Sequence, residues 1–265
     1  VSGNIVRGCP MRTSREWREY YEQNAASLLD IPWNVGGDLT QVERQAIASS
    51  LQGFQAGERS EGRHLYRCAE KYAEESGDHE YVGATRLFIA EEQRHARDLA
   101  RFLELNDIPI LRTTFPDRVF RWLRHVVGGL EISISVLITA EIIAKVYYAA
   151  LEAATNSIIL VTLCDQILSD EQKHVEFQAE QLGKLRARRS RMLYAATIGL
   201  QRFLYWGTCL VVWFFHGKVI RKGELRFGQF WHGCWAEFNR TFGHSKAVAA
   251  YLSSENRTVV EDTAA

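Results

Sequence analysis

Hydrophobic residues recur every three or four positions over long stretches of the chain, with polar residues between them. This period matches one face of an α-helix and differs from the two-residue alternation of a half-buried strand. Proline, which interrupts helices, is absent after Pro116. The pattern predicts four long helices, at residues 40–75, 80–106, 116–154 and 157–188.

The breaks between these helices indicate how they pack. Very short breaks near Gly77 and Asn156 make the first and second helices one antiparallel hairpin, and the third and fourth another. The link over residues 106–115 is longer, so it can cross the bundle. The predicted fold class is therefore all-α, with a four-helix bundle built from two antiparallel helical hairpins.

The rest of the chain is organised around this bundle. Residues 1–38 form an N-terminal lead-in with a short helix around 15–29, and residues 39–190 form the bundle. Residues 191–252 are expected to add C-terminal helices, at about 192–218 and 224–240. A polar and frayed tail is expected at 253–265.

Composition and charge restrict the function classes. Hydrophobic residues make up 46% of the chain and charged residues 24%, an ordinary globular composition that excludes disorder. The chain has 32 Lys and Arg against 32 Asp and Glu, so its formal net charge is zero. Because nucleic-acid-binding proteins usually carry a basic excess, no nucleic-acid partner is expected.

The five cysteines are widely spaced and form no Cys-x-x-Cys pair. This spacing is unlike a disulfide framework, a zinc ribbon or a rubredoxin-type iron site. Scattered reduced thiols are typical of a cytoplasmic protein, which is the expected location.

One charge-free apolar segment, Phe203 to Phe215, stands out in the C-terminal part. It is shorter than the roughly 20 residues that a membrane-spanning helix needs. A buried helix is the expected structure. The alternatives are a surface that docks on a membrane or on a second subunit, as in a homodimer.

The second and fourth predicted helices carry the same five-residue pattern. Residues 91–95 read Glu-Glu-Gln-Arg-His, and residues 170–174 read Asp-Glu-Gln-Lys-His. Glu-x-x-His places both side chains on one helix face. Each motif also has a glutamate about 30 residues upstream, in the first helix of its hairpin: Glu61 before Glu92, and Glu141 before Glu171. The chain thus repeats itself at the level of a helical hairpin.

Distance from the turn sets the height of a residue in an antiparallel hairpin. The midpoint of Glu61 and the first motif lies near Gly77, and that of Glu141 and the second motif near Ser157, both at turns. These side chains can therefore meet in one layer, on otherwise apolar helix faces where an unneutralised carboxylate is costly. Two divalent cations balance four carboxylates, which predicts six metal ligands: Glu61, Glu92, His95, Glu141, Glu171 and His174.

Three more acids lie next to the predicted ligands. Glu58 shares the helix face of Glu61 and is an alternative ligand, but its midpoint misses the turn by about two residues, so it is placed beside the metal site. Glu91 and Asp170 each precede a motif histidine by four positions. An acid at that spacing can accept the second ring N–H of the histidine and fix its tautomer.

Residues 40–190, with these two motifs, resemble the ferritin-like di-metal carboxylate superfamily. This superfamily includes rubrerythrin, bacterioferritin, the ribonucleotide reductase small subunit and bacterial multicomponent monooxygenases. The resemblance implies two iron ions, or a Mn/Fe or Mn/Mn pair, that react with O2 or peroxide. The chain has no Cys-x-x-Cys for a rubredoxin domain, and Leu99 occupies the position of a radical tyrosine.

The expected function is a di-iron oxidase or oxygenase that activates O2 and oxidises a small apolar substrate with electrons from a separate donor. The alternatives are a ferroxidase, a peroxide-scavenging or manganese-catalase-like protein, and a metal-stabilised binding protein without activity. Candidate substrate-pocket residues come from the layer next to the ligands: Tyr66, Phe88, Ser133, Leu137, Tyr148 and Cys164.

Overall fold

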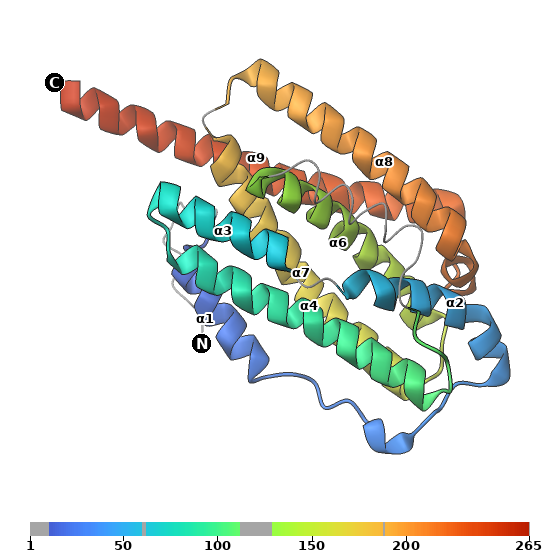
Figure 1. Cartoon of the computed structure of the whole chain (residues 1–265). Helices are drawn as coiled ribbons and strands as arrows, with labels where there is room; N and C mark the ends of the chain where they lie inside the picture. Colours follow the sequence, from blue (N-terminus) through green and yellow to red (C-terminus); the bar gives the residue numbers. More distant parts are fainter. Residues whose placement is uncertain (1–10, 60–61, 112–128, 188, 265) are drawn as a thin grey trace.

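The computed structural model describes residues 11–59, 62–111, 129–187 and 189–264. All regular structure in these ranges is helical, which confirms the all-α prediction for this part of the chain (Figure 1). The helices are α1 (Ser14–Ala25), the short 3-10 helix η1 (Trp33–Val35), α2 (Gln41–Glu58), α3 (Arg63–Ser76), α4 (Glu80–Leu105), α6 (Leu130–Ala153), α7 (Ile158–Arg186), α8 (Arg191–Lys222) and α9 (Phe227–Ala264).

The starts of several helices are fixed by side chains that cap free backbone N–H groups. Thr13 and Thr40 precede α1 and α2, and each forms a capping box with a glutamate three residues later. Ser157 and Ser190 cap α7 and α8 by accepting a hydrogen bond from the backbone N–H three residues on. These caps place the helix starts within a few residues of the sequence prediction.

The single helix predicted at 40–75 is wrong, because the chain forms α2 and α3 there instead. Gly62, just before α3, has a φ of 64°, in the left-handed region that interrupts a right-handed helix. A Cβ at this position would lie 2.5 Å from the Ile89 side chain, so the site also requires a residue without one. The hydrophobic period runs through this break and gives no sign of it.

The remaining boundaries differ less. Residues 116–128 of the predicted third helix lie outside the described residues, and α6 covers the rest of it. The last helix is much longer than predicted, since α9 continues to Ala264 through the region expected to be a frayed tail. Contacts between α9 and α7 explain this extension in part, because Val248 is fully buried beside Gly183.

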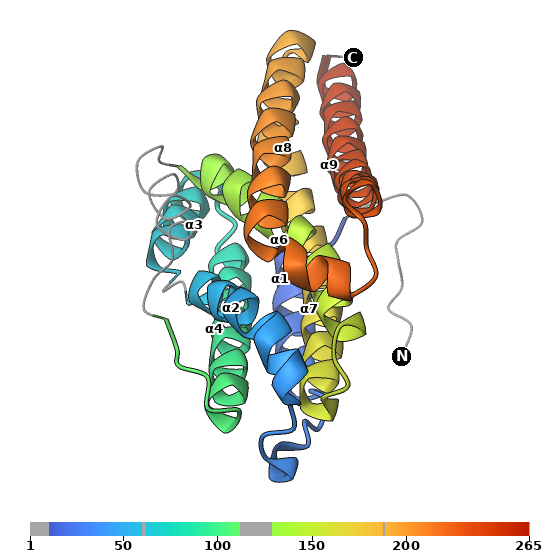
Figure 2. The ribbon, with the colours of Figure 1, turned by 90° about the vertical axis from the view of Figure 1, so that its right-hand side faces the viewer.

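The helices surround a buried core in a layered arrangement (Figures 1 and 2). Helix α3 packs on α4 and α6 packs on α7, while α4 contacts α7 and α3 contacts α6, so the four form a closed ring. Helix α1 lies along α4, and α8 and α9 cover α6 and α7. The second helices of both hairpins therefore meet in the interior of the bundle.

The N-terminal segment predicted as a lead-in is part of this core. Trp17 and Tyr21 of α1 are almost fully buried, and both rings contact Phe177 of α7. Trp17 Nε1 also donates a hydrogen bond of 2.6 Å to Glu180. Helix α1 thus closes the outer side of the bundle where α4 and α7 meet.

Two helices in the described ranges are long and apolar enough to cross a membrane, but their surroundings differ. The apolar window of α6, with mean hydropathy 1.6, is 67% buried in the protein, as a core helix is. The window of α8, with mean hydropathy 1.3, is only 33% buried. The buried helix expected at 203–215 is therefore wrong for one face, where Phe203 and Phe214 are 74% and 81% exposed.

Candidate metal centre

The two Glu-x-x-His motifs meet where α4 contacts α7 and form a compact cluster with two further glutamates. One group consists of Glu58, Glu92, His95 and Glu171, and the other of Glu92, Glu141, Glu171 and His174. Within each group one ligand atom per residue lies within 4.8 Å of all the others, close enough to hold a metal ion. Glu92 and Glu171 belong to both groups.

The structure brings five of the six predicted ligands together, and the sixth prediction falls on a residue that the structure does not describe. Glu61 lies outside the described residues. Glu58, expected beside the cluster, belongs to it and is the last residue of α2. The Tyr148 hydroxyl on α6 donates a hydrogen bond of 2.8 Å to Glu58 Oε1 and so fixes the orientation of this carboxylate.

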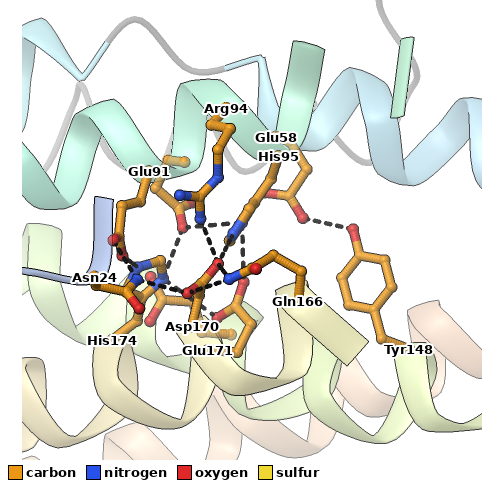
Figure 3. Close-up of polar contacts among 12 residues, drawn as sticks. Asn24, Glu58, Glu91, Arg94, His95, Tyr148, Gln166, Asp170, Glu171 and His174 are labelled. Carbon is orange, nitrogen blue, oxygen red and sulfur yellow. Dashed lines mark hydrogen bonds and ion pairs between the residues drawn. The ribbon is translucent and has the colours of Figure 1, made fainter. Parts of the chain in front are cut away.

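Each motif histidine is held by an acid on the opposite helix (Figure 3). His95 Nε2 lies 3.0 Å from Asp170 Oδ2, and His174 Nε2 lies 2.9 Å from Glu91 Oε2. The pairing predicted within each helix is therefore wrong, and the partners are exchanged between α4 and α7. An acceptor at Nε2 leaves the lone pair on Nδ1, which is the tautomer that a metal ligand requires.

The two Nδ1 atoms face the carboxylates shared by both groups. His174 Nδ1 lies 2.9 Å from Glu92 Oε1 and 3.7 Å from Glu171 Oε2. His95 Nδ1 lies 3.8 Å from both Glu92 Oε1 and Glu171 Oε1. The two Nε2 atoms thus bind Asp170 and Glu91, while the two Nδ1 atoms and the glutamate oxygens surround one common space.

Asp170 is the most heavily hydrogen-bonded acid of the site. Besides His95 it accepts hydrogen bonds from Asn24, Gln166 and Arg94 (Figure 3). Burial alone would raise its pKa, but the hydrogen bond and charge of His95, with the charge of Arg94, lower the pKa of Asp170 to about 2. Asp170 therefore stays ionised and keeps accepting the His95 ring N–H.

Asn24 of α1 connects both acids, although the sequence gave no reason to single it out. Its Nδ2 donates to Glu91 Oε1 at 2.6 Å and to Asp170 Oδ1 at 2.8 Å. Gln178 plays a related part by donating to Glu141 Oε2. These amides lie on helix faces that carry no motif, so only their position in the fold reveals their role.

Several buried ligand atoms lack a hydrogen-bond partner among the described residues. They are His95 Nδ1, Glu141 Oε1 and Glu171 Oε2. His174 Nδ1 faces the acidic Glu92 Oε1 at 2.9 Å. A buried polar atom without a partner costs about 1–3 kcal/mol. The three atoms without a partner are candidate ligand atoms around the same space, so bound cations would satisfy them together. The residues present therefore fit a metal centre.

The ionisation of the cluster also reflects excess negative charge. Burial raises the pKa values of Glu58 and Glu141 well above their ordinary range, and neighbouring carboxylates raise them further. Burial likewise raises the pKa of Glu171. Burial would lower the pKa of His174, but hydrogen bonds to Glu171, Glu91 and Glu92 raise it well above its ordinary value. The cluster therefore retains protons that a divalent cation would displace.

The walls of the cluster are largely aromatic on the α1 side. The Phe88 ring packs edge-on against His174 with ring centres 4.7 Å apart, and the Tyr21 ring lies 6.1 Å away. Both side chains are almost fully buried. They exclude water from this side of the cluster.

The other predicted pocket residues lie in different surroundings. Ser133 is buried and donates to the backbone oxygen of Gly129, and Cys164 is buried with its thiol pKa raised by burial. Leu137 is partly buried. Tyr66 lines a separate hollow of about 460 Å³.

A groove of about 1020 Å³ lies between α3, α6, α7 and α8, lined by the start of α6 and the end of α7. None of the six predicted pocket residues lines it. Its apolar wall includes Val136, Leu200 and Leu204, and charged side chains such as Lys71 and Arg186 also line it. Its volume is at the upper end of the range typical of small-molecule sites.

Comparison of the chain with known protein families, with curated proteins and with solved structures found no match. The buried carboxylate and histidine cluster is therefore the observation on which a functional assignment depends.

Proposed function

We propose that this chain is a di-iron oxidoreductase that activates O2 and oxidises a small apolar organic substrate, with electrons from a separate donor. The observation that carries this proposal is the overlap of the two ligand groups. Each has its own histidine and its own terminal glutamate, and both share Glu92 and Glu171. Glu92 and Glu171 would therefore help to hold both ions of a two-metal site.

Charge supports two cations rather than one. The carboxylates of Glu58, Glu92, Glu141 and Glu171 carry four negative charges when ionised, and two divalent ions neutralise them. Oxygen-rich ligands with imidazole suit iron and manganese, and thiolate ligands that would favour other metals are missing from both groups. An iron pair supplies the electron transfer to O2 that the chain's own side chains cannot perform.

The protein side chains would position and shield this centre. Asp170 and Glu91 hold the two imidazoles with Nδ1 facing inward, and Tyr148 orients Glu58. Phe88 and Tyr21 keep water away from His174. A dry and preorganised ligand set strengthens the electrostatic interactions inside the site.

The arrangement of the helices supports the resemblance to ferritin-like proteins. The α3–α4 and α6–α7 hairpins each contribute a Glu-x-x-His from the second helix, and further glutamates come from α2 and α6. The apolar groove supports an organic substrate. Val136 on its wall precedes Glu141 by five residues, which is about 7.5 Å along the axis of α6.

Anaerobic loading with Fe(II), followed by mixing with O2, tests this function. We expect two irons per chain and O2 consumption that continues when a chemical reductant is supplied. Glu141→Gln should bind less iron, whereas Glu176→Gln, an ion-paired surface position on the same helix as Glu171, should behave as the wild type.

The alternatives give different results in this experiment. Oxidation of excess Fe(II), or disproportionation of H2O2, with no dependence on a reductant indicates metal or peroxide handling. Two bound metals that do not react with O2 or H2O2 indicate a structural centre. Zero iron in the wild type overturns the metal assignment itself.

A further inference from the structure

The outward face of α8 is a continuous apolar surface. Exposed large side chains follow a spacing of three or four residues along one side of the helix. Met192, Phe203 and Phe214 are 83%, 74% and 81% exposed. The full set is Met192, Leu193, Leu200, Phe203, Trp206, Leu210, Val211, Phe214 and Phe215. A face of this length exceeds what soluble monomers usually expose.

The opposite face of α8 is fastened to the protein, so the apolar face cannot rotate inward. Gln201 donates hydrogen bonds to Ser135 O at 2.8 Å and to Thr139 Oγ1 at 2.7 Å. The Tyr205 hydroxyl donates to Cys234 O on α9 at 2.6 Å. Trp206 and Trp213 of α8 also pack on Trp235 and Phe230 of α9, and beyond these contacts the two helices diverge (Figure 1). The helix therefore presents one face to its surroundings and does not separate from the body to span a bilayer.

The charges of α8 indicate the occupant of this face. From residue 191 to residue 222 the helix contains no Asp or Glu and five basic residues. Arg191 lies at one end of the apolar face, and Lys218, Arg221 and Lys222 lie at the other. Because the chain as a whole has no net charge, this excess is a local property of the helix.

We propose that the exposed face of α8 docks on the surface of a bilayer that contains anionic lipids. The helix lies in the plane of the interface, with its aromatic side chains at the boundary of headgroups and acyl chains and its basic ends on lipid phosphates. A second copy of the chain is a poorer match, because its α8 would bring the same basic ends and no acidic residue to pair with them. The proposal concerns a helix that carries none of the candidate metal ligands and does not rest on the proposed function.

In the docked position, the groove lined by α8 would lie next to the bilayer. Leu193, Leu200 and Leu204 of α8 form one wall of the groove, so its border adjoins the docking face. An apolar molecule dissolved in the bilayer would enter the groove without passing through water.

Vesicle flotation with the full chain tests the proposal. We expect the protein to float with vesicles of phosphatidylcholine and phosphatidylglycerol, and to remain unbound with phosphatidylcholine alone. The double variant Phe203→Ser/Phe214→Ser should lower the partition coefficient about tenfold or more, because two aromatic side chains leave the lipid. Val42→Ser, at an apolar position of α2 that is 71% exposed, is the matched control and should bind as the wild type.

The basic residues are tested separately. Arg191→Gln/Lys222→Gln should weaken binding several-fold and reduce its dependence on salt, whereas Lys246→Gln, an exposed position on α9, should not. Equal binding to neutral and anionic vesicles, or binding that both α8 variants retain, overturns the proposal. So does a stable dimer in light scattering that Phe203→Ser/Phe214→Ser converts to a monomer, since a second copy then covers the face.

Discussion

His95 on α4 is hydrogen-bonded to Asp170 on α7 at 3.0 Å, although Glu91 precedes it by four residues on its own helix. The reciprocal bond joins His174 on α7 to Glu91 on α4 at 2.9 Å. Each acid that precedes a shared glutamate therefore holds the histidine of the other helix. This exchange makes the two motifs one unit, because neither histidine is oriented by its own helix alone.

Asp170→Asn should disturb this unit without removing a ligand. The amide can present its N–H to His95 and so favour the wrong tautomer, and the ion pair with Arg94 is lost. We expect metal affinity to fall about 10- to 100-fold, as for other residues that orient metal-bound histidines. A metal titration with a competing chelator measures this. Asp165→Asn, an exposed position of α7, should leave the affinity unchanged, and an equal loss there would contradict the role of Asp170.

Much of the cluster could be predicted because the relevant helices are straight and their turns are short. Inside α4 and α7 the helical period fixes which residues share a face, which places Glu92 with His95 and Glu171 with His174. The short turn between α6 and α7 fixes the height of Glu141 relative to the second motif. These relationships are local, so a single sequence contains them.

The place of Glu58 in the cluster could not be predicted from the spacing, because the helix that the spacing assumes is interrupted. Counting residues back from the turn assumes one continuous helix, and the left-handed φ of 64° at Gly62 breaks it. The count then loses its meaning for residues before Gly62, and Glu58 enters the cluster in spite of it. The hydrophobic period alone does not reveal the conformation of one glycine.

Contacts between distant segments could not be predicted from the hydrophobic pattern of the sequence either. Asn24 lies 67 residues before Glu91 and 146 before Asp170, and its own helix carries no motif. Likewise, the apolar run in α8 predicted a buried helix, but the structure shows that many of its large side chains are exposed. Tertiary packing, not local preference, decides both cases.

Glu58→Gln should selectively weaken one of the two ligand groups. The amide keeps the size of the side chain and can still accept the Tyr148 hydrogen bond, but it removes an anionic ligand. Because Glu141 and His174 are unaffected, we expect metal content to fall from two ions to one per chain. Elemental analysis after gel filtration gives this number. Glu61→Gln is the comparison, and a larger metal loss there would return the ligand role to Glu61.

Glu43 should make the stability of the fold depend on pH in acid. It accepts hydrogen bonds from Thr40 at the start of α2 and from Thr155 and the Asn156 backbone between α6 and α7. Burial opposes ionisation, but these bonds outweigh it and lower the pKa of Glu43 to about 2 from an ordinary 4.5. Its contribution is present above pH 4.5 and is lost as the pH falls towards 2.

Glu43→Gln should therefore destabilise the protein at neutral pH and have less effect near pH 3. Denaturant unfolding at several pH values measures the difference in the free energy of unfolding between variant and wild type. A difference that stays constant from pH 6 to pH 3 would show that Glu43 acts through packing and not through its charge.

The stability of the protein should depend on pH in opposite directions with and without bound metal. In the metal-free chain the folded-state pKa values of Glu58 and Glu141 are raised, so their contribution to stability is present below the ordinary 4.5 and is lost as the pH rises. The raised pKa of His174 acts in the same direction above its ordinary 6.5. Metal ions bind the deprotonated ligands, so their affinity increases over the same range.

We therefore expect the difference in Tm between Mn(II)-loaded and chelator-treated protein to widen from about pH 5.5 to about pH 8. Manganese is chosen because it resists air oxidation during the scan, and buffers with small ionisation enthalpies limit the change of pH on heating. In Glu141→Gln one raised carboxyl is absent, so the metal-free Tm should fall less steeply with pH while the gain from metal becomes smaller. A Tm difference that narrows as the pH rises would mean that the cluster holds protons, and not metal ions, in its functional state.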